Sequence, residues 1–415
     1  MSENRPIALD GVKVLDLTDI KGQFCGKLMA SLGAEAIKIE KPGGDAERML
    51  PPFADNVPGP ENSLWYASWN TNKKSITLDI ESTQGKEIFK KLVEDADFVI
   101  ESFTPGYMES LGLGYDELEK INKSVIMTSI TPFGQYGPYS KYKASDLTIN
   151  AMSCLLFLIG ERDGSPVRIA VPQAYTLAGA EGFGGSMIAY YYRTQTGEGQ
   201  HVDVCMRDAY LKTTISMLPD YEIGGRICHR AGGYWNIVRD PGNKCIWPCK
   251  DGSVTLRLHG GTFAANTNRA LYEWMESEGY ATEELESVDW DNFDLDKVDQ
   301  GFVDRFEEAI GKFFLTKTRD ELNKTCFEKN IMLLPNLDID EVFDNPQLES
   351  RDYFQKVDEF GKTVEYPGAF LKASETPLLP IVPMPEVGSF NEEVYVNRLG
   401  YSAADLAAMA AEKVI

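Results

Sequence analysis

The chain has 415 residues, a formal net charge of −23 at pH 7, 43% hydrophobic residues and 25% charged residues. It is long enough for two domains, because single hydrophobic cores stop growing at about 250–300 residues, and its composition is that of a globular protein. The acidic balance argues against nucleic acid and anionic membranes as partners, since both repel a negative surface. A polyanionic ligand would therefore need a local basic pocket.

The N-terminal residues have no long apolar run behind them and lack the features of a signal peptide. The longest apolar stretch, within residues 151–160, is far shorter than the about 20 residues of a membrane-spanning helix. We therefore expect a cytoplasmic protein. The seven cysteines are scattered, which fits reduced thiols, and Cys245 and Cys249 lack the second pair of a zinc site, so no metal is expected.

Short apolar runs alternate with helical patterns in the N-terminal third of the chain. Predicted strands cover residues 14–17, 36–39, 75–78, 97–100 and 125–128. Predicted helices cover residues 22–32 and 84–95. This alternation predicts an α/β fold with a mainly parallel sheet, covered by helices on both faces. The absence of a G-x-G-x-x-G motif means that the Rossmann-like shape does not imply dinucleotide binding.

The pattern changes after about residue 215. Residues 224–252 are rich in Gly, Pro and Trp and predict an irregular crossing segment. A strand over residues 253–258 and a helix over residues 266–276 follow. Apolar residues from Phe302 to Phe313 recur at helical spacing and predict an amphipathic helix that faces a core.

A series of short motifs extends along the whole chain. The central signature consists of Pro-Gln-Ala-Tyr-Thr-Leu-Ala-Gly at residues 172–179 and Thr-Gly-Glu-Gly-Gln-His-Val-Asp-Val at residues 196–204. The flanking motifs lie at residues 9–13, 32–34, 37–40, 72–75, 78–79, 103–106, 344–347 and 399–402. Each motif alone is weak, but in this order and spacing the sequence resembles the class III (CaiB/BaiF-type) CoA-transferases.

The resemblance implies a large Rossmann-like domain built from both chain ends, a smaller α+β domain between them, and two chains threaded as interlocked rings. On this basis we expect residues 1–215 and 375–415 to form the large domain and residues 235–345 the small domain. Residues 216–234 and 346–374 would be linkers. The active site would form where two subunits meet.

Position 175 departs from the family pattern. Members carry an aspartate four residues before the signature glycine, Gly179, and this carboxylate attacks the acyl-CoA to give a mixed anhydride and then an enzyme thioester. Here the residue is Tyr175. A phenol has a pKa near ~10 and is mostly neutral at pH 7, and its acyl ester is less activated than an anhydride. We interpret Tyr175 as a packing residue and expect no catalytic nucleophile at this position.

Asp146 is the alternative nucleophile, because it matches a position where relatives carry an acidic residue that lines the site; a positional or hydrogen-bonding role is the other reading. Racemases of the family use a histidine that precedes the aspartate in sequence. His201, His229 and His259 all follow Tyr175, which disfavours racemase chemistry.

The resemblance also implies a site for coenzyme A. Lys41 and Lys143 fall where relatives place basic residues near CoA, and the glycine-rich turn after Lys41 lets backbone amides approach an anion. Leu78 and Phe103 match positions at the nucleotide end, and the following residues of the Phe103 motif, Pro105 and Gly106, belong to the expected site.

Two departures weaken this expectation. Ser110 replaces a usual arginine, and Glu81 stands where a lysine can occur. Losing a guanidinium removes bidentate phosphate binding. Weakened CoA binding is therefore expected, with Lys41 and Lys143 as plain surface charges the alternative.

The favoured function is that of a subunit in a heteromeric CoA-transferase, whose homologous partner carries the aspartate. The resemblance extends to the aspartate-lacking subunit of members that move CoA between succinyl-CoA and benzylsuccinate in anaerobic aromatic degradation. Tyr190–Tyr192 and Trp235 would suit an aromatic acid, although such residues more often pack a core or an interface. The alternatives are a self-sufficient enzyme that uses Asp146, and a non-catalytic protein that binds acyl-CoA or an organic acid.

Overall fold

The computed structural model describes residues 5–235, 242–295, 297–368 and 370–415. The chain divides into two compact units. Unit 1 consists of Met1–Ser153, Ile169–Thr214 and Pro346–Ile415, and unit 2 of Cys154–Arg168 and Ile215–Asn345. Unit 1 therefore contains both ends of the chain, and unit 2 is contributed by internal segments.

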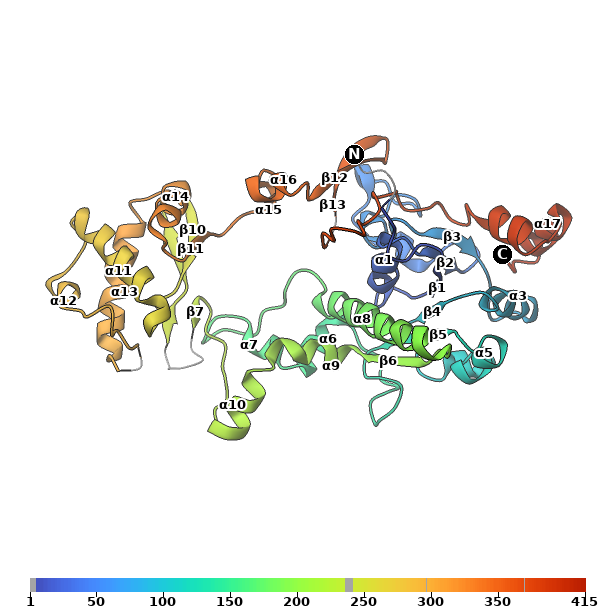
Figure 1. Ribbon diagram of the computed structural model, residues 1–415, viewed down its shortest axis with the longest axis horizontal. Coiled ribbons are helices and arrows are strands. Elements are labelled where there is room, and N and C mark those ends of the chain that lie inside the picture. Colours follow the sequence, from blue (N-terminus) through green and yellow to red (C-terminus); the bar gives the residue numbers. More distant parts are fainter. Residues whose placement is uncertain (1–4, 236–241, 296, 369) are drawn as a thin grey trace. The chain divides into compact units, whose positions relative to one another are not determined.

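A six-stranded parallel sheet forms the centre of unit 1, with the strand order β3-β2-β1-β4-β5-β6 (Figure 1). Its strands are β1 (Lys13–Leu17), β2 (Glu35–Glu40), β3 (Lys74–Thr77), β4 (Phe98–Glu101), β5 (Ile126–Thr131) and β6 (His201–Cys205). The first five confirm the predicted strands to within a few residues. The mixed α/β class and the parallel sheet are thereby confirmed.

The helices of unit 1 follow these strands in the sequence. They are α1 (Gln23–Ser31), α2 (Leu64–Asn70), α3 (Thr83–Val93), α4 (Tyr107–Ser110), α5 (Tyr115–Ile121), α6 (Asp146–Met152), α8 (Gln173–Thr196), α9 (Met206–Leu211), α16 (Pro346–Ser350) and α17 (Ala403–Ala411), with short 3-10 turns at Ala46–Met49, Ala54–Asn56 and Lys212–Thr214. The predicted helices over residues 22–32 and 84–95 correspond to α1 and α3.

Alternate residues of the strands face opposite sides of the sheet. One side packs against α3, α5 and the C-terminal segment, and its core includes Leu15, Ile37 and Phe89. The other side faces α1 and α8: the hydroxyl groups of Thr128 on β5 and Ser186 on α8 are 2.7 Å apart. Helices thus cover both faces, as the sequence predicts.

The C-terminal segment completes the first core. The π-helical turn Glu392–Arg398 places Val394 and Tyr395 in this core, together with Met409 of α17. The hydroxyl of Tyr395 also donates a hydrogen bond of 2.6 Å to the carbonyl of Thr77 at the end of β3.

Residues 346–374, which the sequence analysis takes as a linker, contain the antiparallel hairpin β12 (Phe354–Glu359) and β13 (Lys362–Pro367). Val357 and Tyr366 of this hairpin are buried in a small core with Tyr66 of α2 and Met384. The hairpin is part of unit 1.

Unit 2 contains a three-stranded antiparallel sheet, ordered β11-β10-β9, and several helices. Its elements are α7 (Leu155–Leu158), α10 (Met217–Gly224), β7 (Tyr234–Trp235), β8 (Asn243–Lys244), β9 (Ile246–Cys249), β10 (Gly252–Leu256), α11 (Thr262–Ser277), α12 (Glu283–Glu286), α13 (Gln300–Phe314), α14 (Arg319–Lys329), β11 (Leu333–Pro335) and α15 (Ile339–Phe343).

The predicted strand over residues 253–258 and the two predicted helices correspond to β10, α11 and α13. The core of unit 2 is aromatic and includes Trp247, Phe306 and Phe313. The segment 224–252, expected to be irregular, contains the short strands β7, β8 and β9, while its residues 236–241 lie outside the described part of the chain.

Across the four described ranges, no helix is both long and apolar enough to traverse a bilayer. These residues also contain no group of three or more His, Cys, Asp or Glu side chains arranged to hold a metal ion.

Candidate functional site

A cavity of about 330 Å³ lies at the carboxyl edge of the parallel sheet. Its lining comes from the loops after β1, β4 and β5: Asp19, Lys21, Ser102, Phe103, Thr104, Pro105, Pro132, Ser140, Tyr142, Lys143 and Ala144. The chain proceeds from β1 outward to β2 and β3 and then returns to the other side of β1 as β4, so β1 and β4 flank a topological switch point. Ligands of open α/β sheets bind in the crevice at such a point. We call this the switch-point cavity.

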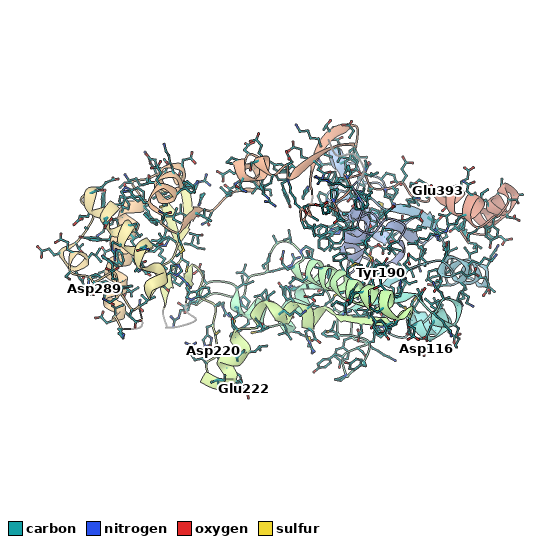
Figure 2. The ribbon with its side chains drawn as sticks, in the orientation of Figure 1. Asp116, Tyr190, Asp220, Glu222, Asp289 and Glu393 are labelled. Carbon is teal, nitrogen blue, oxygen red and sulfur yellow. The ribbon has the colours of Figure 1, made fainter. Side chains whose placement is uncertain are left out.

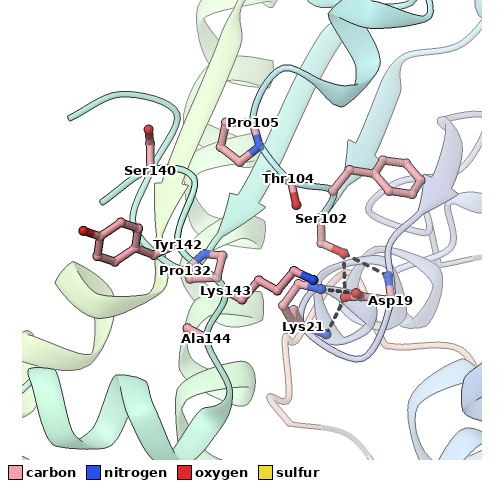
Figure 3. A pocket seen from close by; sticks show the side chains of 11 residues that line it. Asp19, Lys21, Ser102, Thr104, Pro105, Pro132, Ser140, Tyr142, Lys143 and Ala144 are labelled. Carbon is pink, nitrogen blue, oxygen red and sulfur yellow. Dashed lines mark hydrogen bonds and ion pairs between the residues drawn. The ribbon is translucent and has the colours of Figure 1, made fainter. Parts of the chain in front are cut away.

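A polar network holds the two loops of this switch point together (Figure 3). The hydroxyl of Ser102 donates to Asp19 Oδ1 at 2.8 Å, and the Asp19 backbone N–H donates to the Ser102 hydroxyl at 2.9 Å. The Lys21 backbone N–H also donates to Asp19 Oδ1, and its ammonium forms an ion pair with the same carboxylate. The network fixes the cavity floor and leaves Asp19 paired with a cation.

Three of the predicted site residues, Phe103, Pro105 and Lys143, lie together in the switch-point cavity. The Lys143 side chain extends toward Asp19 and Lys21 (Figure 3). Two lysines therefore face one cavity against a single carboxylate, and this surplus of positive charge suits an anionic ligand even though the whole chain is acidic.

Lys41 lies on the exposed surface beyond β2 and is paired with Glu81. The Lys41 ammonium is 3.1 Å from Glu81 Oε1, and the same oxygen accepts a 2.7 Å hydrogen bond from the Tyr107 hydroxyl. The Tyr107 hydrogen bond, followed by Lys41, lowers the pKa of Glu81, so Glu81 is ionised at neutral pH. Tyr107 packs on Phe103, with ring centroids 4.6 Å apart, which links this cluster to the cavity loop. Glu81 thus forms an ion pair with Lys41, one of the two lysines expected near CoA.

Leu78 and Gly106, the other two predicted site residues, do not line the switch-point cavity. Leu78 is only 2% exposed and belongs to the main core of unit 1, so it supports the site from within and lines neither cavity of this region. Gly106 has a positive φ of 92°, which favours glycine, and begins α4. It lines a neighbouring cavity of about 590 Å³, which shares Pro105 with the switch-point cavity.

The neighbouring cavity contains His201 and a group of acidic residues, among them Asp116 of α5, labelled in Figure 2. His201 is stacked on Tyr115, with centroids 5.7 Å apart, and its Nε2 is 2.9 Å from the hydroxyl of Ser129. Burial lowers the pKa of His201, so the ring is neutral at pH 7. The neutral imidazole itself provides no positive charge for a phosphate, and the cation that lines this cavity is Lys141, beside several carboxylates.

Glu101, at the end of β4, fixes the loop that lines the switch-point cavity. Its carboxylate accepts the backbone N–H of Phe103 at 2.7 Å, and the side chain is buried at 4% exposure. Burial raises the pKa of Glu101 to about 7, against the opposing effect of hydrogen bonds from Ser129 and Phe103.

Asp146 forms two hydrogen bonds with the start of α8, one to Tyr175 and one to Ala174. The Asp146 backbone N–H donates to the Tyr175 hydroxyl oxygen at 2.9 Å, and the Ala174 backbone N–H donates to Asp146 Oδ1 at 2.9 Å. Asp146 is 5% exposed. Its carboxylate therefore satisfies one of the free N–H groups in the first turn of α8, a role that carboxylates commonly fill at helix N-termini.

The signature glycine has a packing role one turn further along. Helix α8 crosses α1 so closely that a Cβ on Gly179 would stand 2.8 Å from the Cβ of Phe24. Near the other end of α8, Tyr190 (Figure 2) packs on Phe98 of β4, with ring centroids 5.7 Å apart. The position of Tyr175 is thus set by a helix that is anchored along its length.

Asp19, Lys21 and Ser102 are not among the site residues predicted from the sequence. The signal was present: all three follow predicted strands at the carboxyl edge of the sheet. What the sequence alone lacks is the strand order, which makes the loops after β1 and β4 neighbours.

Fold and site together define an α/β protein with a parallel six-stranded sheet and a lysine-lined cavity at the switch point of that sheet. The profile of CoA-transferase family III matches residues 9–391. The chain belongs to this family.

Individual relatives agree with that assignment. Succinyl-CoA:(R)-benzylsuccinate CoA-transferase subunit BbsE of Thauera aromatica is 32% identical over 95% of each chain. The beta subunit of succinyl-CoA–L-malate CoA-transferase of Chloroflexus aurantiacus is 28% identical, over 99% of this chain and 98% of that protein. Among solved structures, a CaiB/BaiF family protein from Brucella suis superposes with a TM-score of 0.79 at 25% identity, covering 95% of this chain and all (100%) of the other.

Proposed function

We propose that this chain is the nucleophile-lacking subunit of a heteromeric CoA-transferase. Its homologous partner would supply the aspartate that carries the acyl group. The pair would move CoA from an acyl-CoA such as succinyl-CoA to an organic acid, with an aromatic acid such as benzylsuccinate as the first candidate. The membership of the family and the subunit names of two relatives support this proposal.

The observation that carries the proposal is the hydrogen bond that the Tyr175 hydroxyl accepts. The Tyr175 phenol stands at the position of the family nucleophile and accepts a hydrogen bond from the Asp146 backbone. Acyl transfer in this family needs a carboxylate that becomes an anhydride and then a thioester. A phenol at this place offers neither the charge nor an equally activated acyl group.

The same geometry argues against Asp146 as a replacement nucleophile. Its carboxylate is buried and accepts the Ala174 N–H, so an attack on a thioester would give up the bond that caps α8. In our proposal Asp146 positions α8, while the lysines of the switch-point cavity and the Phe103 loop contact the acyl-CoA.

The test is a CoA-exchange assay with succinyl-CoA and benzylsuccinate. Three samples are compared: this chain alone, an aspartate-bearing homologue alone, and the two after co-expression. We expect exchange only in the co-expressed pair. Mass spectrometry of the pair after incubation with succinyl-CoA should locate the covalent adduct on the partner.

Tyr175→Phe is the matched variant, because it removes the hydroxyl and keeps the ring. The pair that contains it should keep its exchange rate within about twofold, since the phenol takes no part in the chemistry. Exchange by this chain alone, or an adduct on this chain, would overturn the proposal.

A further inference from the structure

Unit 1 contains another cavity, of about 310 Å³, that shares no lining residue with the two cavities described above. It lies between α1, the end of α2, the β12–β13 hairpin and residues 378–381. Its lining is largely apolar and aromatic. Phe24, Trp69, Phe370 and Leu378 are among the residues that form it, and we call it the Lys27 cavity.

Lys27, on α1, is the single charged residue among those that line this cavity, all of which belong to the described part of the chain. Its ammonium donates to the carbonyl of Ser68 at 2.6 Å and to the hydroxyl of Thr71 at 2.8 Å. Both acceptors are neutral. Within the described ranges, no carboxylate lies at ion-pair distance from this ammonium.

The nearest acidic influence on Lys27 comes from Glu359, whose carboxylate is already engaged. Glu359 accepts the hydroxyl of Tyr366 and the backbone N–H of Met384. Burial lowers the pKa of Lys27 to about 8, the charge of Lys73 adds to this effect, and Glu359 opposes it. A partly buried cation without a counter-charge is costly, and a bound anion would remove that cost.

The aromatic walls give the cavity a preference for an apolar body. Phe24 and Trp69 meet edge to face with centroids 5.3 Å apart, and Phe370 meets Phe183 of α8 at 6.4 Å. Phe370 is still 44% exposed, so it stands at the rim and can close over a ligand. Pockets for small molecules combine such apolar walls with one well-placed polar group.

We propose that the Lys27 cavity binds a small aromatic or apolar monocarboxylate, with the carboxylate on the Lys27 ammonium and the apolar body between Trp69 and Phe370. This site is separate from the switch-point cavity, and the inference does not rest on the function proposed above. A hydrophobic acid bound here contacts α1 directly and is connected to α8 through Phe370, whose ring packs on Phe183.

The test is the binding of 3-phenylpropionate to the full-length chain, measured by isothermal titration calorimetry at pH 6.5. Lys27→Gln should weaken binding at least about tenfold, the expected effect of losing one charged hydrogen bond. Lys27→Arg keeps the charge and should retain most of the affinity. Lys21→Gln, in the switch-point cavity, is the control for location and should leave the affinity for 3-phenylpropionate unchanged. The neutral amide of the same acid should fail to bind the wild type.

A second readout uses the ionisation of Lys27. With its pKa at about 8, the ammonium is largely neutral at pH 9, so the affinity should fall about tenfold between pH 6.5 and pH 9 in the wild type. The Lys27→Arg variant should lack this fall. Phe370→Ala, at the rim of the cavity, should weaken the binding of 3-phenylpropionate and leave the free energy of unfolding nearly unchanged. Equal affinity in Lys27→Gln and wild type, or a loss caused by Lys21→Gln instead, would overturn the assignment.

Discussion

Asp146 and Tyr175 together connect helices α6 and α8. The Tyr175 hydroxyl reaches the backbone of Asp146, and the Asp146 carboxylate reaches the backbone of Ala174, so α6 and α8 are tied through both residues. A shorter aspartate at position 175 would place its carboxylate elsewhere. Tyr175→Asp alone would therefore remove part of the hydrogen bonding that fixes the start of α8.

The first prediction separates capping from catalysis at Asp146. Asp146→Asn keeps an oxygen acceptor for the Ala174 N–H, because asparagine caps helices about as well as aspartate, so both stability and exchange by the heteromeric pair should be retained. Asp146→Ala removes the acceptor and should lower the free energy of unfolding by ~1 kcal/mol. Urea unfolding and the CoA-exchange assay measure the two effects. Complete loss of exchange in a stable Asp146→Asn variant would instead identify Asp146 as the nucleophile.

At the scale of single residues, the sequence predicts which side chains line the site better than it predicts which residues they contact. The resemblance selects Phe103, Pro105 and Lys143, which do meet in one cavity. It cannot show that Lys41 is paired with Glu81, because that contact joins the ends of two different strands. Nor can the sequence show whether Leu78 lies in the core, where the structure places it, or lines the cavity, since both places favour an apolar side chain.

At the scale of elements, the end of β2 carries a buried ion pair. Glu40 is 1% exposed and Arg48 is fully buried at 0% exposure. The guanidinium binds the carboxylate in a bidentate manner, at 2.7 Å from Nε and 2.8 Å from Nη2, and also donates to the carbonyl of Pro385. One side chain thus connects the sheet, the turn at Ala46–Met49 and the returning C-terminal segment.

The second prediction concerns this pair. Among the described residues, Glu40→Gln leaves Glu61 as the one carboxylate at ion-pair distance from the buried Arg48 charge, and it should lower the free energy of unfolding by about 3 kcal/mol. The control Glu81→Gln breaks the exposed pair with Lys41 and should cost less than about 1 kcal/mol. Chemical unfolding of both variants at pH 7 measures the difference. Equal and small losses would contradict the structural role of Glu40.

The pair also predicts a pH dependence. Burial alone would raise the pKa of Glu40, but the hydrogen bonds and charge of Arg48, with Lys38 and Ser75, lower it to about 2. Since this folded value lies below the ordinary value for glutamate, the stabilisation is complete above about pH 4.5 and is lost as the pH falls through about 2. The stability gap between wild type and Glu40→Gln should therefore narrow as unfolding is measured at successively lower pH.

Which elements the sequence predicts depends on how much of each is buried. The strands of the parallel sheet are largely buried and rich in apolar residues, and α3 and α13 present regular apolar stripes, so all are visible as patterns. The β12–β13 hairpin is not, because only Val357 and Tyr366 of its twelve residues are buried. Most of its other strand residues are charged or polar, and its pairing comes from the backbone.

At the scale of the whole molecule, the described residues form two large hydrophobic cores, one in each unit. Phe89 of α3 lies in the core of unit 1 and Phe313 of α13 in the aromatic core of unit 2, and both side chains are fully buried at 0% exposure. The sequence indicates this division by a change of pattern near residue 215. It does not reveal that residues 154–168 belong to unit 2, because that segment is too short to carry a pattern of its own.

The third prediction is that the two cores unfold separately, because cooperative unfolding is a property of one domain and its core. Phe313→Ala and Phe89→Ala remove equal volumes from the two cores, and each should cost about 3–5 kcal/mol in its own unit. Differential scanning calorimetry of the full-length chain should show two transitions, each variant lowering a different one. Phe313→Ala should also leave 3-phenylpropionate binding intact below its transition, since the Lys27 cavity lies in unit 1. A single transition that both variants lower equally would instead make the two cores one cooperative structure.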